Sequence, residues 1–245
     1  MLTGTDIYGE SGRTAEAARS LEIADRIVTL QEDARERLPA TLRSKALVVF
    51  QSAPTLRPMR KPDGRLDCVA AGHLRAVKDP ATLFAAVRLL PGGLPIHIRH
   101  FGAALEQGLG DEAAALQAHD ARYRFHGARS HARVRAAIRA AHLLVHPSRA
   151  EGGANVIVEA VTAGTPVLAS RIPGNVGMLG SGYSGYFEAA DPAGLARLLQ
   201  RALREPRYLE QLREECASRR RLFRPAVEAR AVRRLVAGML AQGGA

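Results

Sequence analysis

The chain has 245 residues, 47% of them apolar, enough to bury the core of one large domain or two small ones. Its net charge is +11, and because lysine occurs only at Lys45, Lys61 and Lys78, arginine supplies the other 32 of the 35 basic residues. This excess reflects either genome composition or attraction to anionic ligands. Acidic residues interrupt the arginines and no basic arm carries interleaved aromatics, so we expect no nucleic-acid partner.

The cysteine, histidine and apolar patterns exclude several other classes. Cys68 and Cys216 match no metal or redox spacing and are expected to be free thiols of a cytoplasmic protein. The histidine pairs at 97/100 and 142/146 lack a carboxylate that would complete a ligand set, so no metal and no resident cofactor is predicted. The first residues lack the features of a secretory signal, and no apolar run reaches the length of a membrane span.

The chain begins with a short region of mixed elements and a linker. Residues 24–30 have a strand core, residues 31–43 read as a polar helix, and the apolar run 46–50 predicts a strand buried on both faces. Four proline and glycine residues then make residues 54–65 unsuitable for helix or strand. We therefore expect a partial domain over residues 1–53 and a boundary at the linker.

Strands and helices alternate regularly after the linker. The predicted strands lie at 66–71, 96–101, 123–126, 142–146 and 166–170, and the helices between them at 79–90, 111–121, 130–141 and 153–163. A glycine-rich loop then leads to 186–187 and a helix at 192–204, and a helical tail over 206–241 breaks at Pro225. Such alternation predicts an α/β fold, a doubly wound parallel sheet over residues 66–224, with ligands beyond the carboxyl ends of its strands.

The loop after the first of these strands has the composition of an anion site. Gly72 allows a close backbone approach, and His73, Arg75 and Lys78 precede a helix N-terminus, which itself attracts anions. A diphosphate would suit this loop, although an ordinary strand-to-helix loop with solvated charges has the same composition.

The loop after the strand at 142–146 combines a carboxylate with glycines. Glu151 is followed by Gly152 and Gly153, whose backbone N–H groups can bind hydroxyl or phosphate oxygens. Glu159 follows in an apolar helix, where a carboxylate can accept two hydrogen bonds from a ribose diol. A solvated helix residue is the alternative for Glu159.

These loops together resemble family 4 glycosyltransferases of GT-B fold. The resemblance is carried by Phe125-His126-Gly127, the run 141–148, Glu151 with Glu159 eight positions on, and the run Ala163-Gly164-Thr165-Pro166-Val167. The loop from Gly72 to Lys78 is similar to the family's basic loop, with His73 where an arginine is usual.

The resemblance implies roles for these residues. Lys78 and Arg75 would grip the diphosphate of a UDP-sugar co-substrate, Glu159 would hold the ribose, and Glu151 would face the donor sugar. Residues 125–128 would lie near the base. The implied catalytic residues are Glu151, Lys78 and Arg75. The implied donor-binding residues are Gly72, His73, Gly127, Gly152, Gly153, Ala154, Asn155 and Glu159.

A narrower resemblance concerns the selenosugar synthase branch of the family. It rests on the runs 2–8, 48–53, 151–156 and 171–179. It implies transfer of N-acetylglucosamine or glucose from UDP to selenophosphate. Thr3 stands where the wider family commonly has histidine, which fits an anionic nucleophile that needs no general base. The acceptor-side residues would be Thr3, Gly4, Thr5 and Asp6.

The resemblance covers only part of a GT-B enzyme, because about 53 residues stand where the family has a whole N-terminal domain. The helix 225–245 would return to that domain. We expect a half-built sheet, exposed apolar surface and self-association. A nucleotide-sugar-binding fragment without turnover stays open, as does an ordinary transferase with a sugar or lipid acceptor at a membrane, although a membrane surface is the less favoured partner.

Overall fold

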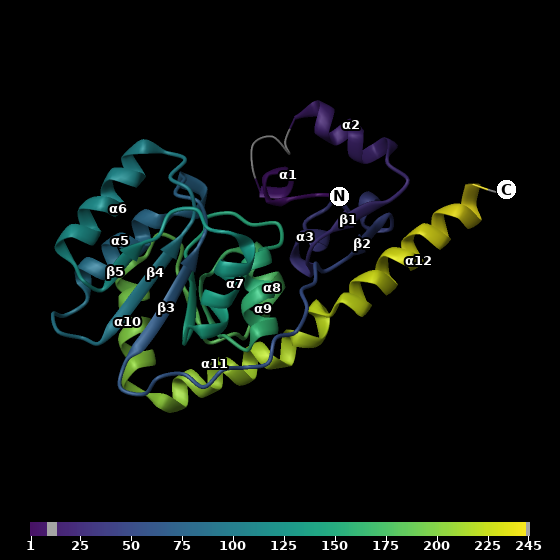
Figure 1. The fold of residues 1–245 in the computed structure, drawn as a ribbon. Coiled ribbons are helices and arrows are strands. Elements are labelled where there is room, and N and C mark those ends of the chain that lie inside the picture. The colour runs from purple at the N-terminus through teal and green to yellow at the C-terminus, as the bar shows by residue number, and fades with distance from the viewer. Residues whose placement is uncertain (9–13, 244–245) are drawn as a thin grey trace.

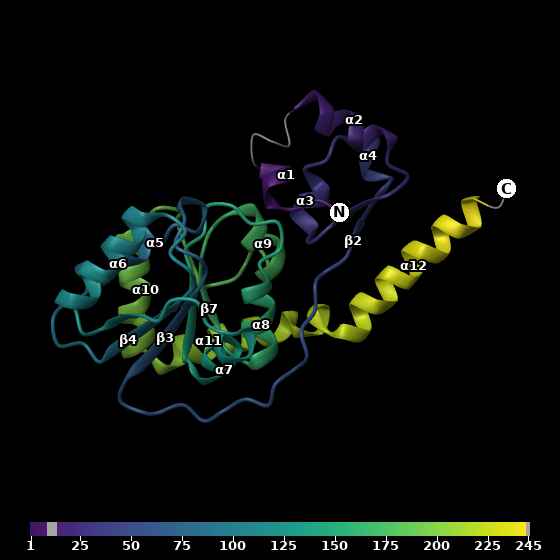
Figure 2. The same ribbon diagram turned by 45° about the horizontal axis from the view of Figure 1, so that its top comes forward.

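The computed structural model describes residues 1–8 and 14–243 and shows two units of unequal size. The larger unit surrounds a six-stranded sheet, and the smaller one contains a two-stranded sheet near the N-terminus (Figure 1). The segment between the two sheets runs along the base of the larger unit, and the last helix, α12, extends away from it (Figure 2).

The larger sheet is entirely parallel, with strand order β5-β4-β3-β6-β7-β8. The order reverses between β3 and β6, so the chain winds outward from these two central strands in both directions. In such a sheet the crevice at the carboxyl ends of the two central strands is where ligands bind. The strands are β3 (Leu66–Ala71), β4 (Ile96–Phe101), β5 (Tyr123–Phe125), β6 (Leu143–His146), β7 (Val167–Ser170) and β8 (Tyr186–Phe187).

Helices cover both faces of this sheet. The helix α5 packs against α6 and α10, and α8 packs against α7 and α11. Apolar residues of both layers and of the strands form one large core, with β6 and β7 buried along their whole length. The helices are α5 (Pro80–Leu89), α6 (Gln107–His119), α7 (His131–Ala140), α8 (Asn155–Ala163), α9 (Pro173–Leu179), α10 (Pro192–Arg204) and α11 (Pro206–Arg219).

The smaller unit is built around two parallel strands, β1 (Ile27–Thr29) and β2 (Ala46–Val48). Its buried cluster has only three members, Ile27, Leu38 and Leu42. The surrounding helices are α1 (Gly4–Tyr8), α2 (Ala15–Ile23), α3 (Glu32–Glu36) and α4 (Ala40–Arg43).

The linker and the C-terminal elements join the units. Hydrogen bonds tie the linker to the larger unit, for example from Leu56 N to Thr162 O and from Arg139 Nε to Arg57 O. A short 3₁₀ helix, η3 (Arg220–Phe223), leads into α12 (Pro225–Gly243), whose Glu228 accepts a hydrogen bond from Ser52 Oγ at 2.5 Å.

Most predicted elements are confirmed, and three expectations are wrong. The helix expected at 31–43 is two short helices, because Pro39 interrupts it. The strand at 46–48 is half-buried rather than buried on both faces, because the small sheet has a single partner strand. The glycine-rich loop after β7 contains α9, which begins at Pro173 in the first helical turn.

Candidate functional site

A cavity of about 510 Å³ opens at the carboxyl ends of β3 and β6, where the strand order reverses. It is bounded by the loop after each of these strands, by the start of α7 and by the first turns of α8. The lining residues include Gly72, His73, Lys78, Phe101, Gly102, Ala128, Arg129, His131, Glu151, Gly153, Ala154, Asn155 and Glu159. The predicted ligand loops therefore meet at one crevice.

An ion pair joins the two central loops across 73 residues of sequence. Lys78 Nζ lies 2.5 Å from Glu151 Oε1, and His146 Nε2 lies 3.2 Å from the same oxygen. The side chains of His146 and Glu151 are buried, whereas that of Lys78 is 24% exposed. The Lys78 ammonium therefore stands at the boundary between the buried carboxylate and the cavity.

The charge state of Glu151 follows from this pair. Burial alone would raise the pKa of Glu151, but contact with His146 and the Lys78 ammonium outweighs burial and holds the pKa well below its usual range. Glu151 is therefore a carboxylate at neutral pH. A second anion that binds Lys78 would have to share the ammonium with Glu151 or displace Glu151 from it.

Backbone and side-chain contacts hold the loops around the cavity in place. Asp79, buried and in the left-handed region at φ 46°, caps α5 and pairs with Arg149 at 3.0 Å. Arg149 N donates to Val77 O, and Ser170 Oγ donates to Ser148 O. The loops after β3, β6 and β7 thus form one connected frame, which presents the N-terminus of α8 to the cavity.

The second predicted carboxylate also has a partner. Glu159 Oε1 lies 2.5 Å from Nε2 of His131, the first residue of α7. Both residues line the cavity, as do Lys78, Ala128 and Arg129. The His131 side chain is 73% exposed and that of Glu159 only 14%.

The N-terminal segment packs against the Glu151 loop. A Cβ atom at Gly4 would lie 2.5 Å from Gly152 N, and one at Gly152 would lie 2.3 Å from Gly4 N. Thr3 N and Oγ1 both donate to Asp6 Oδ2 at 2.7 Å, and these bonds lower the pKa of Asp6. The structure therefore brings the segment 3–6 to the loop after β6.

Four of the predicted residues make contacts that the sequence does not indicate. Arg75 is exposed and is not among the described residues that line the cavity. Gly152 is also outside the lining, since Gly4 covers it. Gly127, at φ 65°, lies in the loop after β5, where its carbonyl accepts a hydrogen bond from Gly102 N. His73 Nδ1 accepts a hydrogen bond from Ala103 N, so the imidazole is fixed by backbone.

Sequence reasoning missed three residues that the fold requires here. The sequence indicates no ligand role for His146 or His131 and no close contact at Gly102, whereas the loop that contains Gly174 is one where a close backbone approach is expected. A Cβ at Gly102 would lie 2.0 Å from Gly72 O, and one at Gly174 would lie 1.9 Å from Glu151 O. No local pattern shows these contacts, because each joins loops from different strands.

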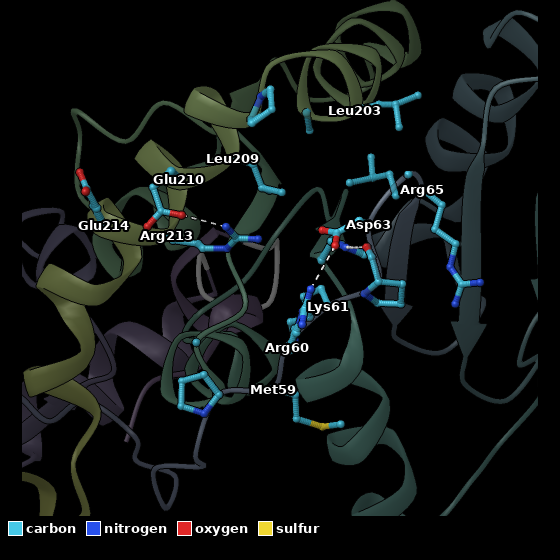
Figure 3. A pocket seen from close by; sticks show the side chains of 18 of the residues that line it. Met59, Arg60, Lys61, Asp63, Arg65, Leu203, Leu209, Glu210, Arg213 and Glu214 are labelled. Atoms are coloured by element: carbon cyan, nitrogen blue, oxygen red, sulfur yellow. Dashed lines mark hydrogen bonds and ion pairs between the residues drawn. The ribbon is translucent and has the colours of Figure 1, made fainter.

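A larger groove, about 740 Å³, lies on the other edge of the sheet, between the linker and α11 (Figure 3). It borders Leu66 at the start of β3 and His142 before β6, the amino ends of the central strands. Its charges are largely paired, Arg60 with Asp63 and Arg213 with Glu210. We therefore place the candidate site at the carboxyl ends and not in this groove.

The Lys61 ammonium has a structural partner in this groove. Burial, and then the charges of Arg213 and Arg139, lowers the pKa of Lys61 to about 8. Its Nζ donates to the carbonyl of Arg139 in the last turn of α7. Lys61 thus caps a helix C-terminus, which accounts for a cation at this place.

An α/β unit whose crevice lies at a reversal of strand order is the frame of a nucleotide-binding domain. Residues 56–221 match the model of the family described as glycosyl transferases group 1, and the chain belongs to this family. The prediction of a family 4-like GT-B glycosyltransferase domain is therefore confirmed.

Two curated relatives match parts of the chain. The D-inositol 3-phosphate glycosyltransferase of Streptomyces griseus subsp. griseus is 29% identical in an alignment 198 residues long, which covers 71% of this chain and 42% of that protein. D-inositol 3-phosphate glycosyltransferase 1 of Catenulispora acidiphila is 42% identical over 76 residues, 31% of this chain and 18% of that protein. The chain spans less than half of the length of the curated relatives it matches.

Solved structures share the fold. Anabaena HepE, in complex with UDP and glucose, has a TM-score of 0.78 at 17% identity, over 96% of this chain and 70% of that one. The sucrose-phosphate synthase of Thermosynechococcus elongatus has a TM-score of 0.78 at 21% identity, over 97% and 65%. The predicted α/β fold of GT-B type is thus confirmed.

The described part of the chain contains neither a metal-binding cluster nor a membrane-spanning helix. No group of three His, Cys, Asp or Glu side chains within residues 1–8 and 14–243 is arranged to hold a metal ion. No helix in this described part of the chain is long and apolar enough to cross a membrane. Cys68 and Cys216 are free and buried, as expected for core thiols.

Proposed function

We propose that this chain binds a UDP-sugar in the crevice between β3 and β6 and takes part in transfer of the sugar to an acceptor. The observation that carries the proposal is the convergence of Lys78, Glu151 and Glu159 on one cavity at the switch point of the sheet. Relatives named as glycosyltransferases and a solved neighbour that holds UDP and glucose support it.

The diphosphate would lie between Lys78 and the N-terminus of α8. The ammonium already contacts Glu151, so an incoming diphosphate finds a cation at the cavity wall and backbone N–H groups at Ala154 and Asn155. As the bond between sugar C1 and the diphosphate oxygen breaks, charge develops on the leaving UDP. A fixed cation and a helix N-terminus stabilise that charge, and positioning supplies the rest of the catalysis.

The ribose and the sugar would lie on opposite sides of this point. Glu159 would accept hydrogen bonds from the ribose diol, with the base toward residues 125–128. Glu151 and the backbone from Gly153 to Asn155 would face the sugar. On this proposal residues 66–224 form the nucleotide-sugar-binding domain and residues 54–65 its linker. Residues 1–53 would be the acceptor side, toward which α12 would return, and the hydrogen bond from Ser52 to Glu228 of α12 supports this.

We propose selenophosphate as the acceptor. In that reaction selenium attacks C1, a C1–Se bond forms and UDP leaves with the electrons of the C1–O bond; water then cleaves the Se–P bond, which releases inorganic phosphate and a 1-selenosugar. The support is the resemblance over the segments that include Thr3 to Asp6, and the contact of Gly4 with Gly152, which puts this segment beside the donor loop. A nucleophile that is already anionic fits Thr3 in place of a histidine base.

Release of UDP from UDP-N-acetylglucosamine or UDP-glucose, with and without selenophosphate, tests both levels of the proposal. Release that requires selenophosphate, with a selenium-containing sugar in the mass spectrum and none from Glu159→Ala, is the expected result. UDP binding without turnover would favour a donor-binding fragment. Release with a sugar or lipid acceptor in place of selenophosphate would favour an ordinary transferase. Absence of UDP binding would overturn the whole proposal.

A further inference from the structure

We infer that His131 is a positioning residue for Glu159, and that through this carboxylate it sets the preference of the site for ribose over deoxyribose. The inference rests on the proposed function, since it concerns how the same cavity would select its nucleotide. It assigns a role to a side chain that no motif of the sequence indicates.

The contact itself is short and joins two different helices. His131 Nε2 lies 2.5 Å from Glu159 Oε1, across 28 residues, where α7 packs against α8. Glu159 is nearly buried, whereas His131 stands at the rim of the cavity, and both line it. Among the described residues no other side chain donates a hydrogen bond to the Glu159 carboxylate. His131 therefore fixes the rotamer of Glu159.

The chemistry of the carboxylate makes this arrangement useful. An ionised carboxylate has two oxygens and about four lone-pair directions, so one bond from an imidazole N–H leaves acceptor sites for two hydroxyls. A carboxylate held in one rotamer costs less entropy to engage than a mobile one. A ribose diol can donate hydrogen bonds to the ordered Glu159 carboxylate from both hydroxyls, whereas 2′-deoxyribose can donate from only one.

The consequence is a selectivity that depends on His131. We expect the wild-type chain to bind UDP about tenfold more tightly than 2′-deoxy-UDP, the effect of one hydrogen bond to a charged acceptor. In His131→Ala we expect UDP binding to weaken about fivefold and this ratio to fall to about two. In turnover assays KM for the donor should rise while kcat stays the same, because Glu159 lies away from the reacting carbon.

Calorimetric titration of the full chain with UDP and with 2′-deoxy-UDP tests the inference. His131→Gln, which keeps an N–H donor near the Nε2 position, should restore most of the ratio, and Glu159→Gln should abolish it. The matched control is His119→Ala, because His119 is an exposed histidine on α6 that bonds Ala115 O outside the cavity. The control should bind like wild type.

Three outcomes decide the question. A ratio that falls in His131→Ala and returns in His131→Gln, with unchanged thermal unfolding, supports the inference. Equal ratios in wild type and His131→Ala, with UDP bound by both, overturn the inference and leave the proposed function intact. A wild-type chain that binds no UDP overturns the proposed function and the inference together.

Discussion

In the six-stranded sheet the central strands are buried on both faces, whereas the strands of the small sheet are only partly covered. Both units use parallel strands joined by helices. The larger one closes a core from two helical layers, while the smaller one buries a cluster of three apolar side chains. Both units therefore contain the same motif of parallel strands joined by helices, but only in the larger unit do helices cover the strands on both faces.

The smaller unit packs against the larger one at glycines, where the absence of a Cβ atom allows close contact. Gly4 contacts Gly152, Leu30 packs on Gly153, and the buried Gln31 packs on Gly177 of α9. A Cβ at Gly177 would lie 1.8 Å from Gln31 Oε1. The comparison teaches that the smaller unit depends on a close backbone approach to the loop after β6 and to α9.

The largest expected effect is a difference in the free energy of unfolding between substitutions in the two cores. Phe84 is fully buried and packs edge-on against Tyr123 at 5.4 Å, so Phe84→Ala should lower the free energy of unfolding by about 3–5 kcal/mol. Leu42→Ala, in the small cluster, should lower it by less than about 0.5 kcal/mol while hydrogen exchange in residues 27–48 accelerates. Urea unfolding measures both. Equal losses would mean that the two units unfold as one.

The next largest effect is on turnover and comes from the contact between Gly4 and Gly152. In Gly4→Val the added side chain cannot fit beside Gly152 N, so we expect the smaller unit to shift while the donor cavity stays intact. UDP affinity should change less than about twofold and turnover should fall more than about tenfold. Gly92→Ala, which meets nothing within 4 Å, is the control. A matching loss of UDP affinity would contradict the separation of donor and acceptor sides.

A pH series tests the ion pair that joins the central loops. The pKa of Glu151 is lowered in the folded chain, so its carboxylate contributes stability above the unfolded-state pKa of about 4.3. This contribution is lost as pH falls through the folded-state value. The wild type should therefore exceed Glu151→Gln in free energy of unfolding near neutral pH, and the gap should close in acid. A gap that is constant with pH would show that the pair does not stabilise the fold.

The smallest effect on stability is expected on α12. Val232, Val236, Met239 and Leu240 are exposed on it, and we expect this apolar stripe to drive self-association. Val236→Lys should change the free energy of unfolding by less than about 0.5 kcal/mol but increase the monomer fraction in sizing chromatography. Ala241→Lys adds the same charge at an exposed position that is not three or four residues from any member of the stripe, and it should leave association unchanged. A sharp monomer peak from wild type would contradict the expectation.

The sequence alone determined the repeating elements and the loops that matter. Short apolar runs predicted β6 and β7, because strands that are buried on both faces are largely apolar. Gly72, Lys78 and Glu151 were predicted as site residues because glycine and charged residues in the loops after such strands have no role in the core. Glu159 was predicted because it is a carboxylate in an otherwise apolar helix. Elements with weaker patterns, such as α9 and the broken helix before β2, could not be resolved in this way.

The tertiary structure decided which of these residues meet. The reversal of strand order between β3 and β6 brings Lys78 to Glu151, and the packing of α7 on α8 brings His131 to Glu159. It also places Arg75 outside the lining of the cavity and packs Gly152 against the N-terminal segment. Periodicity records which face of an element is buried, but it carries no information about which distant element covers that face. Contacts between loops therefore depend on how the whole chain closes its core.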